Sequence, residues 1–154
     1  MLPFDRLVKG VDDWAGDNPD IPVFLQIGDS SYEPRYASWT RILSHAEYLQ
    51  KLRSCQLFVA HVGMGSIIQG LENRKQMLLL PRRADWREHT TDHQLHTAQR
   101  FGGYEGICIV DDVDALQTQM TSMLANPIET DEQFASVAPQ AMIDAVRQYL
   151  TAKY

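Results

Sequence analysis

The stretch LFVAHVGMGSIIQG, residues 57–70, contains the clearest indication of the fold in the sequence. Its apolar start, Leu57 to Ala60, predicts a strand, and the segment from Ser66 to Asn73 is compatible with a helix. Between them, Gly63 and Gly65 predict a tight turn in which the backbone approaches a ligand closely and takes positive φ. A strand, a glycine-rich turn and a helix direct free backbone N–H groups and the positive helix end toward an anion. The stretch therefore predicts a phosphate-binding turn, with a simple tight turn between strand and helix as the alternative.

A second polar cluster follows one strand later in the chain. The apolar run from Met77 to Leu80 predicts a strand that ends at Pro81, and a polar loop over residues 82–88 leads into EHTTDHQ, residues 88–94. Because the carboxyl ends of neighbouring parallel strands meet at one edge of a sheet, we expect the two clusters to converge there. Together they suggest a nucleotide or nucleotide-sugar site.

Strands and helices alternate along the rest of the chain. We expect helices over residues 4–15, 45–54, 89–101, 112–124 and 135–151, and strands over residues 21–27, 39–43 and 107–110. This alternation is typical of the α/β class with a doubly wound parallel sheet, and we expect residues 1–154 to form a single domain. A doubly wound unit normally begins with a strand, whereas this chain opens on a helix. We therefore expect the first strand to be missing or supplied from elsewhere.

The composition is that of an ordinary globular protein with an acidic balance. The net charge of −6 argues against an unassisted nucleic-acid binder, which needs a basic surface. The two cysteines, Cys55 and Cys108, have no metal-binding spacing. Because the sequence contains neither a signal-peptide pattern nor an apolar run of bilayer-spanning length, we expect a cytoplasmic protein. Any membrane contact is expected to be peripheral, at the inner face and through a partner.

Five basic residues lie close together in the sequence despite this acidic balance: Arg74, Lys75, Arg82, Arg83 and Arg87. Such a cluster would suit a diphosphate, an anionic lipid surface or an acidic partner. A solvated face that is neutralised by neighbouring acidic residues explains it equally well.

Two signatures resemble a known family. They are His61-x-Gly63-x-Gly65-Ser66-Ile67 and Pro81-Arg82 followed by Glu88-His89-x-x-Asp92-His93-Gln94. In order, spacing and strand context they resemble the carboxyl-terminal, donor-binding half of GT-B glycosyltransferases of the family 28 type. The small stand-alone version of this domain is most similar, as in the dolichol-linked N-acetylglucosaminyltransferase and bacterial exopolysaccharide glycosyltransferases. The resemblance covers roughly residues 2–124 and implies a Rossmann-like half of a GT-B fold.

The chain departs from this family in three places, one of which is a surface change to Arg74-Lys75-Gln76 from the usual Gly-Lys-Pro. The family's first strand, ending in Gly-Thr just upstream of a Pro-Phe-Asp segment, has no counterpart before Pro3-Phe4-Asp5. Many members carry Glu where this chain has Gln69, whose amide can still bind hydroxyl groups but lacks the charge.

The resemblance implies a UDP-sugar as substrate and no cofactor. The residues that match the family's donor site are His61, Gly63, Gly65, Ser66, Gln69, Arg82, His89, Asp92, His93 and Gln94. Within this set, Gln69 would hold the ribose, and Asp92 and Gln94 would contact the donor sugar or the uracil. Ser66 would cap the following helix or donate to a phosphate, and His61 is either a phosphate or sugar contact or a buried structural histidine. With no Asp-x-Asp motif, helix N-termini at Ser66 and at residues 89–92, together with Arg82, are expected to stabilise the leaving diphosphate without a metal.

A zinc site is the alternative for the second cluster. On a helix over residues 89–101, His89, His93 and His96 would share one face with Asp92 nearby. The cluster lacks the His-Glu-x-x-His pattern of zinc hydrolases, so we expect no metal there.

The sequence thus predicts a subunit that transfers a sugar, with inversion, from a UDP-sugar to a polyprenyl-linked acceptor in polysaccharide biosynthesis. A membrane-associated partner subunit would bind the lipid-linked acceptor and carry the general base, which this sequence does not identify. The alternative is a non-catalytic subunit that stabilises a glycosyltransferase complex, and association between copies of the chain is a further possibility. A free-standing nucleotide-binding module is a third hypothesis without specific support.

Overall fold

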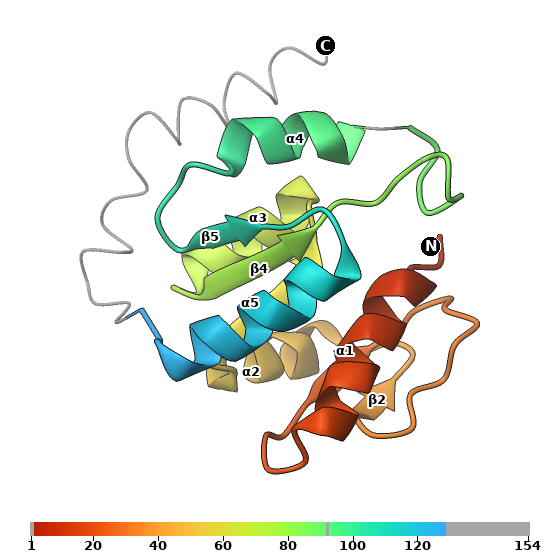
Figure 1. Ribbon diagram of the computed structural model, residues 1–154, viewed down its shortest axis with the longest axis vertical. Coiled ribbons are helices and arrows are strands. Elements are labelled where there is room, and N and C mark those ends of the chain that lie inside the picture. The colour runs from red at the N-terminus through yellow and green to blue at the C-terminus, as the bar shows by residue number, and fades with distance from the viewer. Residues whose placement is uncertain (1, 92, 129–154) are drawn as a thin grey trace.

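The computed structural model describes residues 2–91 and 93–128, which form five helices and five parallel strands (Figure 1). In chain order these are α1 (Asp5–Asp17), β1 (Phe24–Gln26), β2 (Ser38–Thr40), α2 (His45–Ser54), β3 (Leu57–His61), α3 (Met64–Glu72), β4 (Gln76–Leu80), α4 (His93–Phe101), β5 (Ile107–Ile109) and α5 (Val113–Ala125). The predicted α/β class is confirmed, and the arrangement is consistent with a Rossmann-like half of a GT-B fold.

The strands form two separate parallel sheets. One contains β1 and β2, in register from Phe24 opposite Ser38, and the other has the order β3-β4-β5, in register from Leu57 opposite Gln76. Within the described residues β1 and β3 do not pair with each other, and no third strand lies between them. The two sheets are separated between β1 and β3, which is the place where we expect the first strand of a doubly wound sheet to be missing.

Strand β4 is the centre of the core. All five of its residues are buried, and alternate side chains point to opposite faces. On one face Leu78 and Leu80 pack in a cluster with residues of α1 and α5, among them Trp14 and Leu116. On the other face Met77 and Leu79 pack with residues of α3 and α4. Helices therefore cover both faces of the three-stranded sheet, with α1 and α5 side by side in one layer (Figure 1).

Several predicted boundaries are wrong. Strand β1 is shorter than residues 21–27, and β2 occupies residues 38–40 instead of 39–43. Helix α3 begins at Met64, two residues before the predicted start, and α4 begins at His93, four residues after the predicted start. The late start of α4 follows from Glu88, whose carboxylate binds the Arg6 side chain and the Arg83 N–H and so holds the preceding segment as a loop. The helix expected over residues 135–151 lies outside the described residues.

None of the helices in the described ranges is both long and apolar enough to cross a bilayer.

Candidate functional site

The site is built where β3 ends and α3 begins. His61 is the last residue of β3, and Gly63 is the N-cap of α3, with no side chain capping the helix. The first hydrogen bond of the helix runs from the Ile67 N–H to the Gly63 carbonyl. The N–H groups of residues 64–66 find no acceptor among the described residues, and this helix end therefore offers donors and a partial positive charge to an anion.

The two glycines of this turn have different roles. Neither takes positive φ, which the structure shows only at Gly28 and Gly106 among glycines of the described segments, so the predicted conformation of Gly63 and Gly65 is wrong. A Cβ on Gly63 would overlap Cε1 of His61 and lie 2.6 Å from its Nδ1. A Cβ on Gly65 would meet nothing within 4 Å. Gly63 therefore makes room for the imidazole, and Gly65 leaves space open beside the free N–H groups.

The structure brings the two polar clusters together through Gln94. Its Nε2 lies 3.1 Å from Nδ1 of His61, and its Oε1 accepts a hydrogen bond of 3.1 Å from the backbone N–H of Arg82. Gln94 is 6% exposed, and both ends of its amide are engaged. Burial, together with the positive charge of Arg82 and the nearby His89, lowers the pKa of His61 to about 4, so the imidazole is neutral at physiological pH.

The guanidinium of Arg82 is turned to the chain's own carbonyl groups. It lies over the Phe4 ring, 4.8 Å from the centroid, and Nη1 donates to the carbonyls of Leu2, Pro3 and Glu88. The side chain is 8% exposed, and burial lowers its pKa. Arg82 therefore joins the site through its backbone N–H and the bond to Gln94.

The other predicted site residues that the structure describes lie on α3, in the loop before α4 and at the start of α4. Ser66 is the third residue of α3 and does not cap it, because Gly63 occupies the N-cap position. Gln69 lies one turn further along, with Nε2 3.4 Å from a carboxylate oxygen of Glu72 and a buried Oε1 that has no partner among the described residues. His89 lies in the loop before α4, where its Nδ1 accepts from the Thr91 N–H. His93 is exposed at the first turn of α4, and Asp92 lies outside the described residues.

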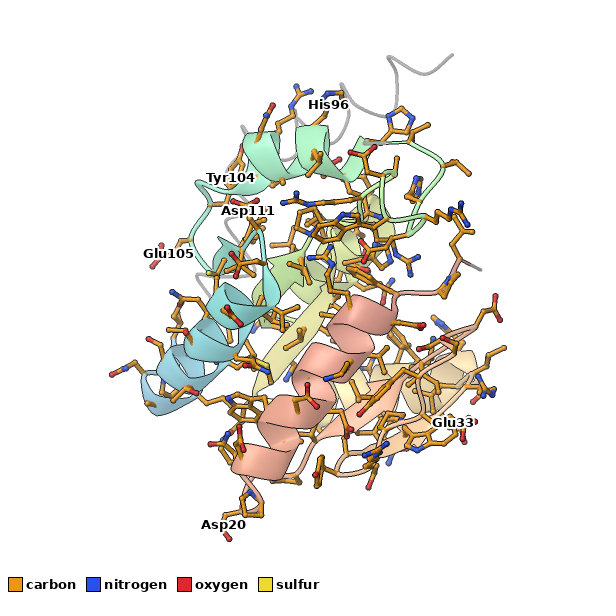
Figure 2. All side chains as sticks on the ribbon, turned by 45° about the vertical axis from the view of Figure 1, so that its right-hand side comes forward. Asp20, Glu33, His96, Tyr104, Glu105 and Asp111 are labelled. Atoms are coloured by element: carbon orange, nitrogen blue, oxygen red, sulfur yellow. The ribbon has the colours of Figure 1, made fainter. Side chains whose placement is uncertain are left out.

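The helical face of three histidines is not formed. Because α4 begins at His93, His89 is not part of the helix, and His96 lies on α4 at the outer surface (Figure 2). Within residues 2–91 and 93–128, no group of three His, Cys, Asp or Glu side chains is placed to hold a metal ion.

The five basic residues do not form one surface. Arg74 and Lys75 precede β4, whereas Arg82, Arg83 and Arg87 follow it, so the strand separates the two groups. The Lys75 ammonium is bound to the carbonyls of Arg53 and Cys55, at the opposite end of the strands from His61.

One feature of this edge has no signal in the sequence patterns. Arg6 on α1 donates from Nε and Nη2 to the two oxygens of Glu88, each at 2.9 Å. The same guanidinium lies 4.5 Å from the centroid of Trp86, and that of Arg83 lies 4.9 Å from it. These contacts join residues about eighty positions apart and fasten the 82–88 loop to the start of α1. The isolated Arg6 in a helical pattern gives no indication of them.

Comparison with known proteins identifies a relative in fold only. No protein-family model matches the sequence, and no curated protein matches it. Among solved structures, the crystal structure of the glycotransferase of kitacinnamycin is similar to this chain, with a TM-score of 0.59 and 22% sequence identity. The similarity covers 95% of this chain and 35% of that one, so this chain spans about a third of the length of that enzyme. In its fold, the chain is similar to part of a glycosyltransferase.

Proposed function

We propose that this chain is the donor-binding subunit of a glycosyltransferase and that its ligand is a UDP-sugar. The observation that carries the proposal is the N-terminus of α3, where three N–H groups without acceptors in the described structure lie beside open space at Gly65 and directly follow Gly63, against which the His61 imidazole lies. An anion with several acceptor oxygens, such as the diphosphate of a nucleotide sugar, suits this set of donors. The fold similarity to a glycosyltransferase and the resemblance of the His61 and Gln94 signatures support the choice of ligand.

The reaction that follows from this proposal is inverting transfer of the sugar to a polyprenyl-linked acceptor. A departing nucleoside diphosphate gains negative charge in the transition state, and the free N–H groups of α3 and a neutral His61 donor would stabilise that charge without a metal. The lipid-linked acceptor and the general base would belong to a membrane-associated partner subunit.

A second candidate function is that of a non-catalytic subunit that stabilises a glycosyltransferase partner. The edges of β1 and β3 that pair with no other strand of the described residues favour it, because they offer backbone groups to another polypeptide whether or not a nucleotide binds.

Titration calorimetry with UDP and UDP-sugars separates the two candidates. We expect a Kd between micromolar and millimolar, roughly 4–8 kcal/mol of binding free energy, for the donor-binding subunit. Gly65→Ala should weaken UDP binding by about tenfold or more, since the new methyl group occupies the space beside the free N–H groups.

Gly103→Ala is the matched control for this variant. A Cβ at Gly103 also meets nothing within 4 Å, but Gly103 follows α4 and lies outside the α3 turn. Its affinity for UDP should equal that of the wild type. Absence of binding heat up to several millimolar UDP would reject the donor-binding function and leave the stabilising subunit.

A further inference from the structure

The orientation of the Gln94 amide is determined by its partners. The Arg82 N–H can only donate, so the atom that faces it at 3.1 Å must be the carbonyl oxygen Oε1. The amide nitrogen Nε2 is then the atom that faces Nδ1 of His61, also at 3.1 Å. Since an amide nitrogen only donates, Nδ1 must accept, and it therefore carries no proton.

The His61 ring consequently carries its single proton on Nε2. Its Cε1–Nδ1 edge lies against Gly63, and Nε2 lies 3.4 Å from the place that a Cβ of Gly63 would occupy, next to the first turn of α3. The charged or titratable neighbours that influence the ring are Arg82, after β4, and His89, in the following loop. Both oppose a positive charge on the ring, as does burial, so the neutral form persists well below neutral pH.

We propose that Gln94 is a positioning residue that holds His61 as a neutral Nε2–H donor, so that the site accepts a ligand atom that only accepts hydrogen bonds, such as a phosphate oxygen. The hydrogen bonds that link these residues run in one direction. The Arg82 N–H donates to Oε1 of Gln94, and Nε2 of Gln94 donates to Nδ1 of His61. His61 thus acts as a donor and not as a proton-transferring base. The location of the ligand rests on the proposed function, whereas the tautomer of His61 does not.

Gln94→Glu reverses the direction of the hydrogen bond between residue 94 and His61, with almost no change in the shape of the side chain. One carboxylate oxygen can still accept from the Arg82 N–H, but the other can no longer donate to His61 and must accept a proton from Nδ1. The variant should therefore place a proton on Nδ1 and raise the pKa of His61 because of the adjacent negative charge. Gln99→Glu is the matched control, since Gln99 is an exposed glutamine on the same helix.

The test is ¹⁵N NMR of the histidine rings, with His61 assigned by its absence in His61→Gln. We expect the wild type to show a neutral Nε2–H ring that does not protonate between pH 8 and pH 5.5, and Gln99→Glu to show the same. Gln94→Glu should show a protonated Nδ1 across this range. A wild-type ring with the proton on Nδ1, or an unchanged Nε2–H ring in folded Gln94→Glu, would overturn the proposal. Even if Gln94→Glu does not fold, the wild-type spectrum still overturns the proposal if it shows the proton on Nδ1.

UDP titration of the same proteins separates this inference from the proposed function. Gln94→Glu should bind UDP at least tenfold more weakly than Gln99→Glu at pH 8.5, where its His61 presents a lone pair instead of a donor. If the wild type binds no UDP but shows the Nε2–H ring, the proposed function fails and the positioning role of Gln94 remains. If UDP binds equally to both variants while the tautomer changes, His61 does not contact the ligand, and the ligand part of the inference is wrong.

Discussion

Asp12 is the buried carboxylate on which the loop after β1 depends. It lies on α1 with 0% exposure and accepts hydrogen bonds from the N–H groups of Arg35, Tyr36 and Ala37 at 2.8–2.9 Å and from the Tyr32 hydroxyl at 2.7 Å. Burial by itself would raise the pKa of Asp12, but these four donors outweigh it and hold the pKa below its ordinary value. The hydrogen bond that the Tyr32 hydroxyl donates to Asp12 raises the pKa of Tyr32 to about 12.

Asp12→Asn should lower the free energy of unfolding by about 1.5–3 kcal/mol at pH 7, because an amide has one acceptor oxygen and would turn its own NH₂ toward N–H donors. Since the folded pKa of Asp12 is depressed, its contribution is complete above the unfolded pKa and is lost as the pH falls through the folded pKa. Urea unfolding followed by circular dichroism should show the gap between wild type and variant closing below about pH 4. Asp13→Asn is the control, since Asp13 pairs with Lys9 at the surface, and its unfolding should differ little from wild type both at pH 7 and below about pH 4.

For single residues, the sequence predicts positions in the fold better than it predicts the roles of the side chains. The spacing of His61, Gly63 and Gly65 located the start of α3 to within two residues, because a strand, glycines and a helix start leave a local pattern. It could not show that Gly63 serves the His61 ring, since that depends on a side-chain orientation fixed by Gln94, thirty-three residues away. Asp12 gave no signal at all, because its partners lie in an irregular loop.

Helix α3 packs on β4 through a close contact at Gly70. A Cβ at this position would overlap Sδ of Met77 and lie 2.8 Å from its Cγ. Met77 is fully buried among Ile67, Leu79 and Phe101, so its side chain has little room to move aside. The position of α3, and with it the N-terminus that faces the site, therefore depends on a glycine in the middle of the helix.

Gly70→Ala should lower the free energy of unfolding by about 1–3 kcal/mol, although alanine is the better helix former, because overpacking outweighs a propensity gain of about 0.5–1 kcal/mol. Gly65→Ala is the same substitution in the same helix at a position with open space, and it should not destabilise the protein. Thermal unfolding of both variants measures the difference. Equal midpoints for the two variants would show that the α3–β4 contact adapts without cost.

Helix and strand boundaries are predicted accurately where nearby residues determine them, and less accurately where distant residues do. Helix α2 was predicted over residues 45–54, where the structure has it, and its start is marked by a local capping box between Ser44 and Glu47. The start of α4 was placed four residues too early, because it depends on the bond between Glu88 and Arg6, which the local pattern does not contain. Pro22 and the exposed Ile21 explain why the apolar run before β1 does not all become strand.

At the level of the whole molecule, β1 and β3 each have one edge that pairs with no other strand of the described residues. On either side of β1, the Ile27 N–H donates to the Thr40 carbonyl and the Val23 carbonyl accepts from the Ser38 N–H. The backbone groups of the odd-numbered residues 23, 25 and 27 therefore point toward β2. The N–H groups of Phe24 and Gln26 are therefore directed to the other edge. Side chains of both sheets, including Leu25 and Val59, nevertheless pack against one core cluster. Partly buried polar edges next to a shared apolar core favour pairing with another strand.

We expect the purified chain to self-associate through these edges. Sedimentation velocity at several concentrations should show species larger than a monomer, and Gln26→Pro should shift the distribution toward monomer. Proline removes the N–H at the free edge of β1 and leaves the hydrogen bonds to β2 in place.

Ile42→Ser is the control for non-specific association. Ile42 is 72% exposed and lies after β2, so removing it reduces apolar surface without altering the edge of β1. Association should persist in this variant. A monomer at all concentrations that unfolds cooperatively would contradict the expectation.

The contact between Arg82 and the carbonyls of Leu2 and Pro3 has a practical consequence for handling the protein. It holds Leu2 and Pro3 at the edge where Arg82 also meets Gln94 and, through it, His61. A purification tag or fluorescent label fused ahead of Leu2 would be attached at this same edge. Binding measured on such a fusion would report the tag's crowding as well as the site's affinity, so the tag should be cleaved before any titration.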